Sequence, residues 1–192
     1  MSKSIIICGI GGQGTVLAAK VVSQAALLAG QRVLAAETIG MAQRGGSVVS
    51  HVRIGEGVYS PLVPEAGADV MIAFEAAEAV RNIGYLSASS IVIVSRTLIP
   101  SVTSSLAGKS FSLDAMLEVL AGKAGKVVAV DTDSACEKLA SAKVANMVLI
   151  GAACGEGLFD RELVDQAMKK LVKADFYELN KKALDFFGKG QD

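Results

Sequence analysis

The chain has 192 residues, of which 52% are hydrophobic and 20% are charged, so it can bury a sizeable core and is not a disordered segment. Its 19 basic and 19 acidic side chains cancel, which excludes the charge imbalance typical of proteins that bind nucleic acid or an anionic membrane. No uncharged run approaches the roughly 18 apolar residues of a membrane span, and no signal-peptide core is present. We therefore expect a cytoplasmic protein with neither a nucleic-acid nor a membrane partner.

The N-terminal part predicts a strand, a helix and a second strand. Residues 4–8 form an apolar, β-branched run bounded by glycine, which is typical of a buried strand. A helix is expected over residues 13–28, with Gly30 as its natural end, and residues 32–37 predict the next strand. Together these segments predict one βαβ unit.

The pattern then changes to one that indicates a hairpin. Residues 47–54 are rich in valine and alternate, residues 55–57 are Gly-Glu-Gly, and residues 58–63 continue in an extended pattern. Pairing of these two segments would place antiparallel strands in the sheet. We therefore expect a mixed sheet and not a purely parallel one.

The remaining segments alternate between strand and helix. Strands are predicted over residues 69–74, 90–95 and 126–131, and helices over residues 75–83 and 112–121, from about residue 134, and beyond residue 143. Ser112, Ser134, Asp160 and Asp175 are the expected N-caps. Residues 1–192 thus predict a single three-layer, Rossmann-like α/β domain, with a mixed sheet containing a hairpin and a helical C-terminal region.

A glycine-rich turn follows the first strand, where Gly9, Gly11 and Gly14 spell G-x-G-x-x-G. A sharp strand-to-helix turn leaves amide N–H groups unpaired at the helix N-terminus, and these favour an anion. Glu37, at the end of the second predicted strand, stands where a ribose-binding acid would stand in a dinucleotide site. The motif is not a P-loop, because Thr15 follows Gly14 where a lysine is needed.

Two other interpretations of this turn stay open. The glycines could serve only the close packing of helix against strand. A nicotinamide site is also open, although the chain offers little for hydride transfer, with one histidine, three tyrosines and no Tyr-x-x-x-Lys. A stand-alone NAD(P)-binding oxidoreductase or sensor domain, or a non-enzymatic α/β interaction module, would fit these interpretations.

A second glycine stretch, Met41-Ala42-Gln43-Arg44-Gly45-Gly46-Ser47, lies between the second strand and the hairpin. The guanidinium of Arg44 suits a carboxylate or phosphate, because it can donate two parallel hydrogen bonds. The alternative is that Arg44 binds carbonyls of its own loop. His51 is the only histidine and falls within a predicted strand. A structural role or a role at a contact surface is expected, and nothing else in the sequence supports a role as general acid or base.

Together the stretches GIGGQGTVLAAK and ETIGMAQRGGSVVSHVRIG resemble the gamma-type subunits of 2-oxoacid:ferredoxin oxidoreductases, the pyruvate/ketoisovalerate oxidoreductase family. VANMVLIGA, residues 144–152, is similar to an asparagine-containing helix of that family. The loop with Met41, Gln43 and Arg44 is closest to the small subunits of the indolepyruvate type. This resemblance covers nearly the whole chain.

The resemblance implies a subunit that is not catalytic alone. It implies a large partner subunit that carries thiamine diphosphate and iron–sulfur clusters, CoA as a substrate of the complex, and ferredoxin as the electron acceptor. The chain has no G-D-G…N-N thiamine motif, and Cys8, Cys136 and Cys154 are too far apart in sequence for a cluster or zinc site. We therefore expect this chain to bind no cofactor or metal alone, and homodimerisation is one way for it to cover an apolar surface.

The candidate ligand-binding or interface residues are Gly9, Gly11, Gly12, Gln13, Gly14, Thr15, Glu37, Met41, Gln43, Arg44, Gly45, Gly46, Ser47 and His51. None of them is expected to be catalytic or to bind a metal.

Overall fold

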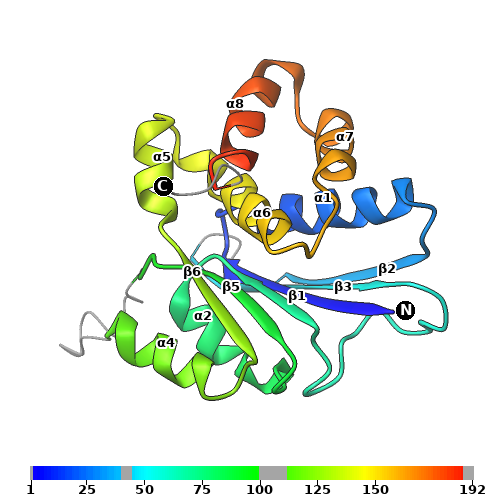
Figure 1. The fold of residues 1–192 in the computed structure, drawn as a ribbon, viewed down its shortest axis with the longest axis vertical. Coiled ribbons are helices and arrows are strands. Elements are labelled where there is room, and N and C mark those ends of the chain that lie inside the picture. The colour runs from blue at the N-terminus through cyan, green and yellow to red at the C-terminus, as the bar shows by residue number, and fades with distance from the viewer. Residues whose placement is uncertain (1, 40–44, 100–111, 188–192) are drawn as a thin grey trace.

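A computed structural model describes residues 2–39, 45–99 and 112–187. Six strands form one sheet in the order β2-β3-β1-β4-β5-β6 (Figure 1). The strands are β1 (Lys3–Ile10), β2 (Val33–Ile39), β3 (Ser47–Ile54), β4 (Val70–Ala73), β5 (Ile91–Ser95) and β6 (Lys126–Val130). β1, β4, β5 and β6 are parallel, whereas β3 runs antiparallel to both β1 and β2. This mixed sheet confirms the predicted fold class.

Helices cover both faces of the sheet (Figure 1). One face carries α1 (Thr15–Leu28), α5 (Thr132–Lys138), α6 (Ala145–Gly155), α7 (Arg161–Leu171) and α8 (Ala174–Leu184). The other face carries α2 (Ala76–Arg81) and α4 (Leu113–Ala121). Short 3₁₀ turns occur at Ile83–Tyr85 and Ala142–Val144. Among the helices of the described residues, none combines the length and the apolar content needed to cross a bilayer.

The central strand β1 is buried on both sides, which explains its unbroken apolar run. Ile5 and Ile7 pack toward α1 and α6, and Ile6 and Cys8 pack toward α2 and α4. All four side chains have 0% exposure. A strand covered on both faces has no polar positions to alternate with the apolar ones, so it is recognised by its continuous run of β-branched residues.

The two strands of the first βαβ unit are separated in the sheet by β3, which the sequence pattern paired with residues 58–63. β1, α1 and β2 follow one another as predicted, but β3 lies between β1 and β2 in the sheet. α1 begins at Thr15, two residues after the predicted start, because Gln13 and Gly14 still belong to the turn. The two strands of the unit are therefore parallel without being neighbours.

The partner predicted for residues 47–54 is wrong, although the sheet does contain a hairpin. β3 pairs with β2 and β1, so both of its edges are occupied and residues 58–63 form no strand. Val58 and Val63 of this segment are buried, and Val63 packs in the hydrophobic cluster on the α2 face of the sheet. Tyr59 and Leu62, between them, are 86% and 56% exposed.

Two of the four predicted N-caps are confirmed and two are corrected. The Ser112 Oγ accepts the N–H of Ala115, and the Asp160 carboxylate caps α7. The helix predicted to begin at Ser134 is instead capped by Asp131, because β6 ends at Val130 and α5 follows at once. Asp175 lies inside the first turn of α8, whose start at Ala174 has no side-chain cap.

Candidate functional site

The glycine turn lies at the carboxyl ends of the parallel strands β1 and β4, where the connections that follow these two strands leave toward opposite faces of the sheet. β1 leads into α1 on one face of the sheet, whereas its parallel neighbour β4 leads into α2 on the other face. In open α/β sheets such a switch point is the usual place for a ligand. Residues 9–14, predicted as a ligand-binding turn, lie at this point.

The turn leaves the N-terminus of α1 open. Gly12 and Gly14 have φ values of 104° and 88°, a left-handed conformation that glycine adopts without strain. Gly14 accepts the first helical hydrogen bond, from Ala18. The N–H groups of residues 15–17 precede that bond and have no acceptor among the described residues. The first turn also has no acidic side chain, so the positive end of the helix dipole is not compensated.

A second helix begins beside the same glycine. Asn146, in the first turn of α6, is 2% exposed, and its Nδ2 lies 2.9 Å from where a Cβ on Gly14 would stand. Its Oδ1 accepts the N–H of Met147, and its Nδ2 has no acceptor among the described residues. The first turn of α6 has no acidic side chain either. Two helix N-termini that lack acidic side chains and a buried amide donor thus converge at Gly14, and all three favour an electron-rich group.

A cavity of about 540 Å³ adjoins the turn. Its walls are the glycines of the turn, the first residues of α1, Lys20 and Val48. Lys20 is exposed and supplies the cationic side chain among these lining residues. Space, backbone donors and a positive charge are therefore found together beside the N-terminus of α1.

Gln13 fills the crevice between the ends of β1 and β4. Its Oε1 accepts the N–H of Ile10 at 2.7 Å, and its Nε2 donates to the carbonyl oxygen of Phe74 at 3.3 Å. A Cβ on Gly9 would come within 2.7 Å of the Gln13 Oε1 and 2.8 Å of the Phe74 Cβ. Gly9 is therefore required for close packing, and the space between these two strand ends is occupied by protein.

The end of the second glycine stretch binds directly to the turn. The N–H of Gly11 donates to the carbonyl oxygen of Gly46 at 2.8 Å, and the N–H of Gly45 donates to that of Gly11 at 3.4 Å. Gly45, Gly46 and Ser47 thus lie beside the glycine turn. Met41, Gln43 and Arg44 lie outside the described residues.

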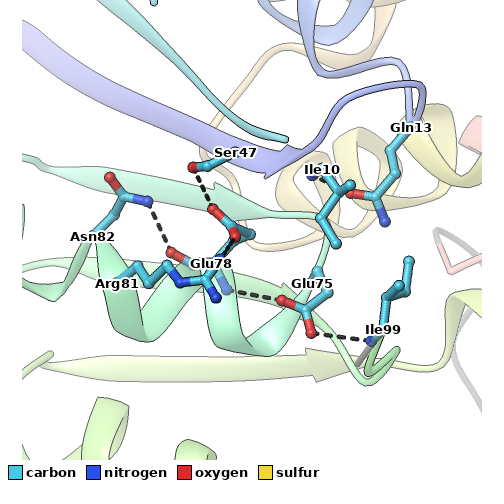
Figure 2. Close-up of polar contacts among 8 residues, drawn as sticks. All are labelled: Ile10, Gln13, Ser47, Glu75, Glu78, Arg81, Asn82 and Ile99. Atoms are coloured by element: carbon cyan, nitrogen blue, oxygen red, sulfur yellow. Dashed lines mark hydrogen bonds and ion pairs between the residues drawn. The ribbon is translucent and has the colours of Figure 1, made fainter. Parts of the chain in front are cut away.

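Two buried carboxylates lie at the start of α2, on the face of the sheet opposite α1, close to the start of β3 (Figure 2). Glu75 and Glu78, at the start of α2, are each 1% exposed. The Oε2 of Glu78 accepts the hydroxyl of Ser47 at 2.5 Å, and its Oε1 pairs with Arg81. Glu75 caps α2 through the N–H of Glu78 and also accepts the N–H of Ile99 at 3.2 Å.

Glu37 and His51 are not brought to the turn. Glu37 is exposed on β2, two strands away from β1 because β3 intervenes. His51 pairs with Ile6 in the middle of the sheet and is 4% exposed. Its Nδ1 accepts the N–H of Val63 at 3.2 Å, so the imidazole is neutral, and burial lowers its pKa. His51 anchors the 58–63 segment to the sheet.

Residues 4–186 match the family described as pyruvate ferredoxin/flavodoxin oxidoreductase. This chain belongs to that family. The match covers the strands, the helices and the glycine turn described above.

Two relatives and one solved structure are similar to this chain. Indolepyruvate oxidoreductase subunit IorB of Archaeoglobus fulgidus is 40% identical over 96% of this chain and 92% of its own. The pyruvate/ketoisovalerate oxidoreductases common subunit gamma of Pyrococcus furiosus is 28% identical over 91% and 89%. The 2-oxoglutarate:ferredoxin oxidoreductase of Magnetococcus marinus, solved with 2-oxoglutarate, coenzyme A and succinyl-CoA bound, shares the fold with a TM-score of 0.74 at 19% identity. That match covers 96% of this chain and 30% of the larger one.

The cysteines of the described residues do not form a metal or cluster site. Cys8 is fully buried, and burial, then the nearby carboxylates of Glu78 and Glu75, raise the pKa of its thiol. Cys136 and Cys154 lie on different helices, and burial raises the pKa of Cys154 to about 12. No group of three histidine, cysteine, aspartate or glutamate side chains in the described ranges could hold a metal ion.

Sequence reasoning did not select four residues that shape this site, namely Lys20, Glu75, Glu78 and Asn146. Asn146 carried a signal, since it is a lone amide within an otherwise apolar helix. The Glu-Ala-Ala-Glu that follows β4 has the spacing of an N-cap and the third helical residue. Neither signal reveals which distant segment the side chain meets.

Proposed function

We propose that this chain is the small, gamma-type subunit of a 2-oxoacid:ferredoxin oxidoreductase of the indolepyruvate type, and that its glycine turn contacts CoA in the assembled enzyme. Membership of the family makes the chain a subunit of a 2-oxoacid:ferredoxin oxidoreductase. The greater identity with the indolepyruvate relative, 40% against 28% for the pyruvate/ketoisovalerate one, supports the arylpyruvate substrate class.

The convergence at Gly14 is the observation that carries the proposed CoA contact. CoA carries a pyrophosphate and a ribose phosphate, which are anionic groups that helix N-termini and amide donors bind well. The first turn of α1 and the Nδ2 of Asn146 meet at Gly14, and Gly14 also lines the cavity to which Lys20 contributes its charge. The related enzyme from Magnetococcus marinus, whose chain includes a domain of this fold, was solved with coenzyme A.

The chemistry of the complex would come from its other subunit. Enzymes of this class decarboxylate a 2-oxoacid, transfer the acyl group to the CoA thiol and pass the released electrons through iron–sulfur clusters to ferredoxin, with thiamine diphosphate stabilising the carbanion. This chain would orient CoA and exclude water from it at the subunit interface. Its partner would be a large subunit that carries the thiamine and cluster sites.

Two features of the described residues argue against the nicotinamide alternative. Gln13 occupies the crevice between β1 and β4 where a dinucleotide would cross the sheet. Glu37 lies two strands from β1 and cannot take the place of the ribose-binding acid on the adjacent strand.

The proposal can be tested with the complex reconstituted from this chain and its large subunit. Asn146→Asp replaces the free donor by a carboxylate of nearly equal size, and we expect the KM for CoA to rise by about tenfold. Lys20→Gln removes an exposed charge and should raise the same KM by about twofold to fivefold. The matched control is Lys170→Gln, which removes an exposed charge on α7.

The two parts of the proposal have separate outcomes. A CoA KM that stays at the wild-type value in both Asn146→Asp and Lys20→Gln would contradict the CoA contact. Indolepyruvate turnover that is no faster than pyruvate turnover, measured as kcat/KM in the same complex, would contradict the arylpyruvate class. Failure of the chain to co-purify with a thiamine-containing partner would contradict its proposed role as the small subunit beside a large, thiamine-carrying subunit.

A further inference from the structure

We propose that Glu78 is a positioning residue that holds residues 45–47 against the glycine turn, and thereby sets the affinity of the turn for its anionic ligand. This inference rests on the proposed CoA contact. Glu78 itself is 1% exposed and lies beneath the sheet edge, so it has no access to a ligand. It would act only through the residues that it binds.

The carboxylate of Glu78 divides its oxygens between two different segments. Its Oε2 accepts the hydroxyl of Ser47, at the start of β3, at 2.5 Å. Its Oε1 pairs with Arg81, one helical turn further along α2. Arg81 is 57% exposed, so the ion pair joins the interior to the surface of α2. Figure 2 shows both contacts meeting at the one carboxylate.

The hydrogen bond from Ser47 matters because of what precedes Ser47 in the chain. Gly46 and Gly45 exchange backbone hydrogen bonds with Gly11, in the middle of the turn. These glycines have no side chains to hold them, and Gly45 has a positive φ of 79°. Ser47 is therefore the first side chain after them that can fix the path of this backbone.

Burial of the Glu78 carboxylate costs hydration free energy, which its partners must restore. An ionised group removed from water must regain its lost hydration from its partners, and Ser47 and Arg81 supply this for Glu78. The same charge, together with Glu75, contributes to the raised pKa of the Cys8 thiol, which places both carboxylates close to the end of β1. Loss of the Ser47 hydroxyl would leave one oxygen of the buried carboxylate without its partner, while the pair with Arg81 remains.

The test compares three variants in the reconstituted complex. Ser47→Ala removes the hydroxyl and leaves the Glu78–Arg81 pair in place. Glu78→Gln removes the charge with little change of shape, and Ser47→Thr keeps the hydroxyl and should stay near the wild type. We expect Ser47→Ala and Glu78→Gln each to raise the KM for CoA by about tenfold while kcat changes by less than about twofold.

A double-mutant cycle separates positioning from direct contact. If Glu78 acts through Ser47, the Ser47→Ala/Glu78→Gln double variant should have nearly the same KM for CoA as either single variant. The matched control is Ser90→Ala. Ser90 is a fully buried serine whose hydroxyl donates to the carbonyl oxygen of Ala68 at 2.6 Å at the opposite edge of the sheet. Its KM for CoA should equal that of the wild type.

Amide hydrogen exchange gives a measurement that does not depend on CoA. Exchange of the Gly11 and Gly45 amides should become about tenfold faster in Ser47→Ala and Glu78→Gln, and stay unchanged in Ser90→Ala. Unchanged exchange in the first two variants would overturn the positioning role even if the CoA contact is real. A raised KM in Ser47→Ala without faster exchange of the Gly11 and Gly45 amides would overturn it too, because Ser47 would then contact the ligand directly. Faster exchange without a change in KM overturns the link to the ligand, and the Asn146 and Lys20 variants then decide the CoA contact itself.

Discussion

The side-chain amide of Gln13 joins the ends of two parallel strands, since it accepts the N–H of Ile10 at the end of β1 and donates to the carbonyl oxygen of Phe74 just after β4. A glutamine at this place in the glycine turn closes the crevice that a dinucleotide would need. The open part of the turn is thereby confined to the N-terminus of α1, beside Gly14 and Asn146. This relationship separates the present site from a nicotinamide site that has the same glycine pattern.

Replacement of Gln13 should destabilise the chain measurably. Gln13→Glu keeps the acceptor for Ile10 but presents a carboxylate oxygen to the carbonyl oxygen of Phe74, so we expect a loss of about 1–3 kcal/mol in the free energy of unfolding. Urea denaturation monitored by circular dichroism measures this loss. The exposed residue Gln31 provides the control, since Gln31→Ala should change the free energy by less than about 0.5 kcal/mol.

A side chain at position 14 should be poorly tolerated. Gly14→Ala places a Cβ 2.9 Å from the Asn146 Nδ2 and imposes a φ of 88° on an alanine. We expect a loss of stability of about 1–3 kcal/mol, seen as a lower midpoint of unfolding. Gly157→Ala isolates the strain, because Gly157 has a φ of 71° and no atom within 4 Å of its added Cβ. Equal losses in the two variants would show that the contact with Asn146 contributes nothing.

His51 should make stability depend on pH near neutrality. Burial lowers its pKa in the folded state below the ordinary 6.5, and its Nδ1 is an acceptor that protonation would remove. Below about pH 6.5 the unfolded chain binds a proton that the folded chain does not, so stability falls as the pH falls, until the folded pKa is reached.

The single histidine makes this prediction easy to isolate. His51→Gln has no group that titrates in this range, and the free energy of unfolding should then be nearly flat between pH 7.5 and about pH 5.5. The measurement is urea unfolding of both proteins at several pH values. Equal slopes for the wild type and His51→Gln would contradict the assignment.

The chain alone should not oxidise any 2-oxoacid. Its buried Cys8 and its separated Cys136 and Cys154 offer no cluster site, so electrons would have no carrier within the described residues. The purified chain, given indolepyruvate or pyruvate with thiamine diphosphate, CoA and a viologen dye, should give no dye reduction. Addition of the large subunit should restore it, and reduction by the single chain would overturn the subunit role.

Arg44 carries a prediction that rests on the sequence alone. A guanidinium that binds a carboxylate or phosphate through two hydrogen bonds is not replaced by an ammonium group. Arg44→Lys should therefore reduce kcat/KM of the reconstituted complex nearly as much as Arg44→Ala, by about 2–4 kcal/mol of transition-state stabilisation if the pair is buried. Unchanged kinetics in both variants would leave Arg44 only the role of binding its own loop.

The sequence by itself determined the features that depend on a few neighbouring residues. The glycine turn, the caps at Ser112 and Asp160 and the continuous apolar strands were predictable, because backbone angles, capping and burial on two faces leave local patterns. Only the tertiary structure decided which segments meet. β3 pairs with β2 and β1 and not with residues 58–63, since a strand's partner is chosen by the edges that remain free in the whole sheet. The contacts of Asn146 with Gly14 and of Ser47 with Glu78 likewise join elements distant in sequence, and no local pattern records the packing that brings them together.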